Sequence, residues 1–108
     1  MSKLREQLVR KLQRMGVEER TWPGRDDGFS SLEFAGKDFA HFHNDGELDI
    51  RLGRNLIKRE GLVHPPDSKV HPGRSQNSQW IEIRFTTPQG VEKIVDLVRL
   101  VIAEIAAR

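Results

Sequence analysis

Four side chains able to do acid–base or metal-binding chemistry lie close together in the middle of the chain: His41, His43, Glu47 and Asp49. The two histidines occupy alternate positions, and the two carboxylates do the same a few residues later. Alternate residues of a strand point to the same face of a sheet. If the two segments pair as a hairpin, the imidazoles face the carboxylates. Such a group can bind a metal ion, transfer protons or contact a ligand.

A binding surface is the function that these residues favour. Its predicted contacts are two imidazoles, two guanidinium groups and an indole, from His41, His43, Arg51, Trp80 and Arg84. This set suits a small anionic ligand or a protein partner. No catalytic residue stands out, because the chain has no nucleophile elbow and no glycine-rich phosphate loop. The sequence therefore predicts a binding or accessory module without a cofactor, and it leaves open whether the chain is an enzyme.

A metal-dependent protein or enzyme is the alternative. Its ligands would be His41 and His43 with Glu47 or Asp49. The spacing of the two histidines and Glu47 is similar to the first metal motif of cupins. A second cupin motif is absent, and the chain ends in a long apolar helix where a cupin barrel needs more strands.

The connection His64–Ser78 adds two histidines, His64 and His71, each followed by proline. At 15 residues, this connection is longer than most loops in compact domains. It is rich in proline, glycine, serine and asparagine, which predicts a lid or a binding loop. We expect residues 67–76 to be the most mobile internal segment, because Val70 is the one apolar residue that could anchor them.

The apolar residues predict the register of the hairpin. A three-residue loop over Asn44-Asp45-Gly46, with a left-handed Gly46, pairs apolar Phe42 with Leu48. The opposite face then carries three further pairs, His41 with Asp49, His43 with Glu47 and Phe39 with Arg51. Because a facing carboxylate favours the imidazolium, we expect raised pKa values for both histidines.

The pattern of apolar residues predicts an α+β fold in a single domain over residues 1–108. Helices are predicted over Lys3–Met15 and Arg54–Glu60 and from Pro88 to the C-terminal end, and strands over Phe29–Phe34, Asp38–His43, Glu47–Leu52 and Gln79–Phe85. Residues 21–28 are predicted to form turns. The order α-β-β-β-α-β-α indicates a four-stranded antiparallel sheet with helices on one face.

Composition narrows the functional class. The 108 residues include no cysteine, which excludes disulfides and thiolate metal sites. The 18 basic and 16 acidic residues are interleaved, and the basic residues of the first helix, Arg5 among them, are predicted to face solvent. We therefore expect no nucleic-acid partner. No apolar run approaches the roughly 20 residues that span a bilayer, and the N-terminal residues do not resemble a signal peptide. A cytoplasmic protein is the expectation.

From Gly36 to about Val101 the chain resembles the luciferase-domain family of bacterial and fungal proteins. The core of the match is the stretch from Gly36 to Ile50, with its Phe-Ala-His-x-His sequence and Asp-Gly turn. Asp49 stands where many members have a histidine, and Leu62 stands where a tryptophan is usual. The element order is also similar to YjbR-type double-wing proteins. The resemblance implies a fold and a small module, not a light-emitting reaction.

Overall fold

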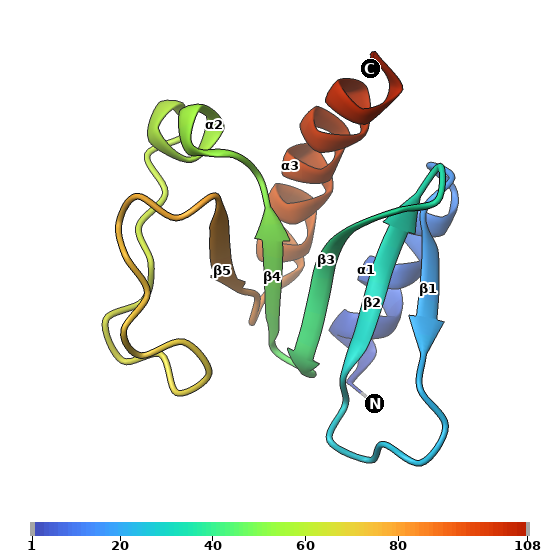
Figure 1. The fold of residues 1–108 in the computed structure, drawn as a ribbon. Coiled ribbons are helices and arrows are strands. Elements are labelled where there is room, and N and C mark those ends of the chain that lie inside the picture. Colours follow the sequence, from blue (N-terminus) through green and yellow to red (C-terminus); the bar gives the residue numbers. More distant parts are fainter. Residues whose placement is uncertain (1, 108) are drawn as a thin grey trace.

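The computed structural model describes residues 2–107 and shows one twisted antiparallel sheet with two long helices behind it (Figure 1). The elements are α1 (Lys3–Gln13), β1 (Glu18–Thr21), β2 (Ser30–Phe34), β3 (Lys37–Asn44), β4 (Glu47–Arg51), α2 (Arg54–Arg59), β5 (Trp80–Arg84) and α3 (Pro88–Ala106). The strands lie in the order β1-β2-β3-β4-β5, so each pairs with its neighbours in sequence. The predicted α+β class is confirmed.

The sheet has five strands, so the predicted count of four is wrong. The additional strand is β1, which pairs antiparallel with β2 from Glu18↔Glu33 to Thr21↔Ser30. Its sequence Glu-Glu-Arg-Thr contains no apolar residue, and three of its four side chains are exposed. An edge strand that buries neither face gives no alternating apolar signal, which is why the sequence did not predict it.

The core lies between the sheet and the helices α1 and α3. In α3 the buried residues form one wide stripe along the helix: Val91, Ile94, Val95, Leu97, Val98, Val101 and Ile105. Leu8 and Leu12 of α1 are fully buried beside it. Both long helices begin with hydroxyl caps, since Ser2 Oγ accepts from Arg5 N at 3.1 Å and Thr87 Oγ1 accepts from Gly90 N at 3.0 Å.

The β3–β4 hairpin has the predicted register in its centre, where Ala40 faces Ile50 and Phe42 faces Leu48. Near the turn the prediction is wrong, because Asn44 and not His43 pairs with Glu47. Asn44 closes the turn with its own side chain. Its Oδ1 accepts from Gly46 N and its Nδ2 donates to Glu47 Oε1, both at 2.8 Å. Gly46 is not in the left-handed region, and His43 becomes the extra residue of a β-bulge.

A second bulge moves Phe39 off the predicted outer face. The β2–β3 pairing steps from Leu32↔Ala40 to Glu33↔Asp38, which leaves Phe39 unpaired. Phe39 is 2% exposed and lines a surface hollow with Val101 of α3. The predicted pairing of Phe39 with Arg51 is therefore wrong, because one extra residue reverses the alternation of the strand.

Arg5 brings a charge into the interior, contrary to the prediction of a solvated helix face. Its side chain is 3% exposed, and its guanidinium lies 4.3 Å from the centroid of the Phe42 ring. Nη1 donates to the carbonyl of Gly28 at 2.6 Å and to Asp45 Oδ1 at 3.0 Å. Nη2 donates to Ser30 Oγ at 3.0 Å and lies 3.4 Å from Glu19 Oε2. One side chain of α1 thus joins β1, β2 and two turns.

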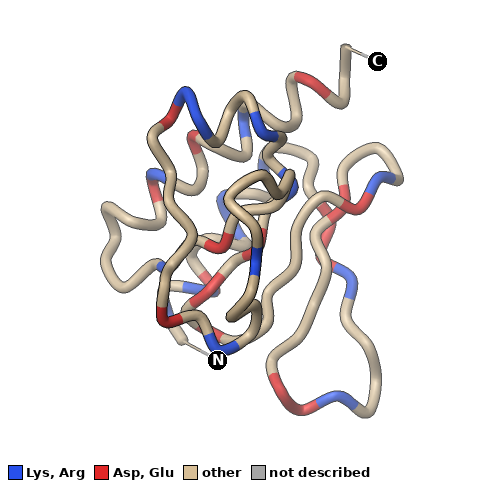
Figure 2. Tube along the Cα trace, turned by 60° about the vertical axis from the view of Figure 1, so that its left-hand side comes forward, with Lys and Arg blue, Asp and Glu red and all other residues tan. Residues whose placement is uncertain are grey.

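Charges of both signs alternate along the chain, and Figure 2 shows lysines and arginines interleaved with acidic residues over most of the trace. Many are already matched by a neighbour, as in the ion pairs Lys11–Glu92 and Arg99–Asp96. Within residues 2–107, no helix has the length and apolar character needed to cross a membrane.

Candidate functional site

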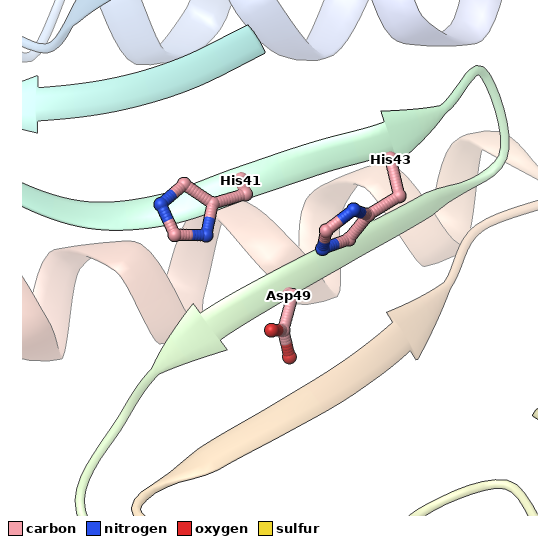
Figure 3. Close-up of side chains that lie close together, drawn as sticks. All are labelled: His41, His43 and Asp49. Carbon is pink, nitrogen blue, oxygen red and sulfur yellow. The ribbon is translucent and has the colours of Figure 1, made fainter. Parts of the chain in front are cut away.

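Three predicted site residues meet on the sheet face that points away from α1 and α3. His41 and His43 extend from β3 and Asp49 extends from β4, all in front of the sheet in Figure 3. One nitrogen of each imidazole and one carboxylate oxygen lie within 4.8 Å of one another. The register explains this geometry, because His41 is directly opposite Asp49. Asp49 is only 3% exposed, which is unusual for a carboxylate.

The connection between α2 and β5, residues 60–79, supplies the partners of Asp49. The guanidinium of Arg74 binds both carboxylate oxygens, with Nη2 3.0 Å from Oδ2. Nε2 of His71 lies 3.4 Å from the same Oδ2. This connection also binds β5, because Ser68 Oγ donates to Glu82 Oε1 at 2.8 Å. The expectation that only Val70 anchors residues 67–76 is wrong, since Val70 is exposed and the anchors are polar.

Aromatic rings hold the imidazoles in place. Trp80 of β5 stacks on His41, with centroids 5.0 Å apart and an interplanar angle of 13°. Phe29 stacks on the same imidazole at 5.6 Å. His43 meets His71 edge to face at 5.1 Å. The rings thus form a continuous layer over the outer face of the sheet.

Burial favours the neutral form of two of the imidazoles. It lowers the pKa of His43, and the nearby His71 lowers this pKa further. Burial likewise lowers the pKa of His71, and the Arg74 guanidinium acts in the same direction. The predicted rise in the pKa of His43 is therefore wrong, because burial outweighs the opposite effect of the nearby Asp49 carboxylate and the predicted partner Glu47 pairs with Asn44. Among residues 2–107, neither His43 Nε2 nor His71 Nε2 has a hydrogen-bond partner, although both atoms are buried.

These lowered pKa values predict that acid destabilises the protein. In the unfolded chain a histidine has a pKa of about 6.5, so His43 and His71 contribute stability above that pH. This contribution is lost as the pH falls through their folded-state values. We expect the midpoint of urea unfolding, measured with a chelator present, to fall between pH 7.5 and pH 5.5. His43→Gln should show a shallower decline.

The pH dependence of the wild type must be compared with that of His43→Gln, because Glu82 also titrates. Burial raises the pKa of Glu82, so its contribution to stability has the opposite sign over the same pH range. That contribution is common to wild type and variant and cancels between them. Equal slopes in the two proteins would mean that His43 titrates like a free histidine.

Glu47 and Glu82 form a pair of carboxyl groups beside the histidine cluster, which consists of His41, His43 and Asp49. Burial raises the pKa of Glu82, and the hydrogen bond between the two carboxyl groups raises it further and lowers the pKa of Glu47. Arg84, one of the predicted ligand contacts, lies 3.5 Å from Glu47 Oε2 and 2.9 Å from Asp67 Oδ1. Both its neighbours are acidic. Glu47 thus belongs to the carboxyl pair with Glu82. The side chains close enough to share one metal ion are His41, His43 and Asp49, and Glu47 is not among them.

Arg51, another predicted contact, pairs across the sheet with Trp80 but does not belong to the group of His41, His43 and Asp49. It is exposed at the end of β4 and lines two surface hollows beside Glu104, near the end of α3. Sequence reasoning did not include Phe29, and it placed His71 only on a mobile loop. The role of Arg74 carried no signal, because it depends on a contact with Asp49, 25 residues away.

The model of the luciferase-domain family matches residues 36–101, which is more than half of the chain. The chain belongs to the luciferase-domain family. This confirms the resemblance found in the sequence. The matched region begins at the β2–β3 turn and ends within α3, so it contains the luciferase-domain residues His41, His43, Asp49, His71 and Arg74. Neither a curated protein nor a solved structure gives a significant match to the chain.

Proposed function

We propose that this luciferase-domain protein is a small binding module whose outer sheet face takes one divalent transition-metal ion. The ligands are His41, His43 and Asp49, and the observation that supports them is their spacing within 4.8 Å. Imidazole nitrogen and carboxylate oxygen bind such ions at roughly 2 Å, so two ligands of one ion lie at most about 4 Å apart. Small rotations of the side chains, together with release of one Asp49 oxygen from Arg74, would therefore complete the site.

The protonation state of the histidines supports a cation. A ligating imidazole must be neutral, because the lone pair that binds the ion is otherwise protonated. Burial lowers the pKa of His43 and His71, which favours the neutral form near pH 7. A metal ion would also give the unpartnered Nε2 of His43 a bonding partner.

An anionic ligand finds less to bind on this face. Arg74 is bound to Asp49, and Arg84 lies against Glu47 and Asp67. These two guanidinium groups are thus neutralised, and a new anion would compete with carboxylates of which Asp49 is buried and Glu47 half-buried. The metal-binding alternative is therefore better supported on this face than the small anionic ligand.

Metal titration tests the proposal. Protein stripped with a chelator should bind one equivalent of Zn²⁺ by isothermal titration calorimetry, and Co²⁺ should give visible absorption bands from nitrogen and oxygen ligands. His41→Ala and His43→Ala should each weaken binding by at least about tenfold, since losing even an outer-shell partner costs roughly that much.

His64→Ala is the matched control, because His64 lies outside the group of His41, His43 and Asp49 and its Nε2 bonds the His71 carbonyl oxygen. Its affinity should stay near that of the wild type. The proposal fails if stoichiometric binding is absent, or if His64→Ala weakens binding as much as His43→Ala does.

A further inference from the structure

A second candidate site includes Trp80 but none of the residues His41, His43 and Asp49. It is a hollow of about 290 Å³ between α2, residues 61–78 and β5. Its apolar wall is formed by Ile57, Leu62, Val63, Trp80 and Ile81. This volume is at the lower end of the range for small-molecule sites, so its occupant would have to be small.

Exposed apolar surface marks this hollow. Val63 is 79% exposed, which makes it the most exposed large hydrophobic residue among those that the structure describes. It stands at the hollow beside the half-buried Leu62 and Trp80. An apolar group bound here would cover surface that is otherwise in contact with water.

The charges beside the hollow are of one sign. Arg54 and Lys58, one helical turn apart in α2, both line it. Within residues 2–107 neither forms an ion pair, whereas the adjacent Arg59 pairs with Glu60. No carboxylate lines the hollow. These two cations therefore differ from Arg74 and Arg84, whose charges are matched.

A polar atom in the wall also lacks a partner. His64 lines the hollow, and its Nε2 lies 2.8 Å from the carbonyl oxygen of His71. Because a carbonyl only accepts, this Nε2 is the donor, which leaves Nδ1 as the acceptor of the neutral ring. Nδ1 is buried without a hydrogen-bond partner among the described residues. In this tautomer His64 offers no free donor to an anion, so the charged contacts of a bound carboxylate depend on Arg54 and Lys58.

We propose that this hollow binds a small organic carboxylate with a compact aromatic or branched apolar group. The apolar group would pack on Trp80 and Leu62, and the carboxylate would lie at Arg54 and Lys58. The inference is independent of metal binding, because none of the hollow's lining residues is a proposed metal ligand. In this proposal Trp80 contacts the ligand, as the sequence predicts, and the Trp80 ring also stacks on His41.

Benzoate is the probe for the test, with chelator present throughout so that metal binding plays no part. Two-dimensional NMR resolves the indole N–H of Trp80 from that of Trp22, the other of the two tryptophans. Benzoate should shift the Trp80 signal with saturation and a Kd of roughly millimolar, as expected for a ligand of so few atoms. Benzyl alcohol, which lacks the charge, should bind more weakly.

Charge variants show whether the contact is specific. Lys58→Gln and Arg54→Gln should each weaken benzoate binding roughly two- to fivefold, the usual size of an exposed charge interaction. Arg59→Gln removes the same charge from the same helix outside the hollow and should leave the affinity unchanged. Unsaturated shifts, equal binding of benzyl alcohol, or equal weakening by Arg59→Gln would overturn the proposal.

Discussion

Replacing Arg5 with methionine should lower the free energy of unfolding by about 3 kcal/mol, the usual cost of removing one partner of a buried ion pair. The guanidinium is 3% exposed and makes hydrogen bonds to Gly28, Ser30 and Asp45. Methionine fills a similar volume but leaves these acceptors without a donor, and Glu19, 15% exposed, loses its cation. In a chain of this size the melting temperature should fall by roughly 10–20 °C.

Arg10→Met is the matched control, because it removes the same charge from the exposed face of the same helix. Its effect should stay within about 0.5 kcal/mol. Arg5→Lys should fall between the two, since an ammonium keeps the charge but cannot reach several acceptors in fork geometry. Urea unfolding of all three variants tests this, and equal losses for Arg5→Met and Arg10→Met would show that the network contributes nothing.

Arg74→Gln should change stability and metal affinity in opposite directions. Without the guanidinium, the buried Asp49 carboxylate loses the one arginine or lysine paired with it among residues 2–107, and burial favours the neutral form of the His71 imidazole 3.4 Å away. We expect unfolding in the presence of a chelator to become easier by about 2–3 kcal/mol. The same substitution frees both carboxylate oxygens for an ion. If Asp49 is a metal ligand, Zn²⁺ should bind about tenfold or more tightly.

Lys69→Gln is the control, because Lys69 is an exposed cation of the same connection without an ion-pair partner among the described residues. It should alter neither property. Calorimetric Zn²⁺ titration and urea unfolding together give the answer. A loss of both stability and Zn²⁺ affinity in Arg74→Gln would mean that Arg74 supports the histidine cluster and does not compete with the ion for Asp49.

The central register of the hairpin could be predicted because its apolar residues specify it. Phe42 and Leu48 are both fully buried, and only one alignment places them opposite each other on the core face. That alignment also brings His41 to Asp49, so half of the candidate site followed from the core. Family resemblance rests on the same stretch, which lies inside the matched region.

The bulges and the role of the connection could not be predicted in the same way. The bulge at His43 depends on the Asn44 side chain, which closes the turn through hydrogen bonds that leave no periodic pattern. Ser68 and Arg74 are polar residues in a segment without regular structure, and their partners lie in distant strands. Composition indicated a mobile loop, whereas pairing with the buried Asp49 and Glu82 holds the loop against the sheet.

The sequential strand order bears on how quickly this chain folds. From β1 to β4 each strand pairs with the next one along the chain, through the two-residue turns Ala35-Gly36 and Asp45-Gly46 and the longer connection over residues 22–29. Contacts between such near neighbours form with little loss of chain entropy, so this meander should assemble early. β5 can join only after the long segment between Arg51 and Trp80 closes. Since residues 60–79 lie within that segment, the histidine cluster should acquire its cover in the last step of folding.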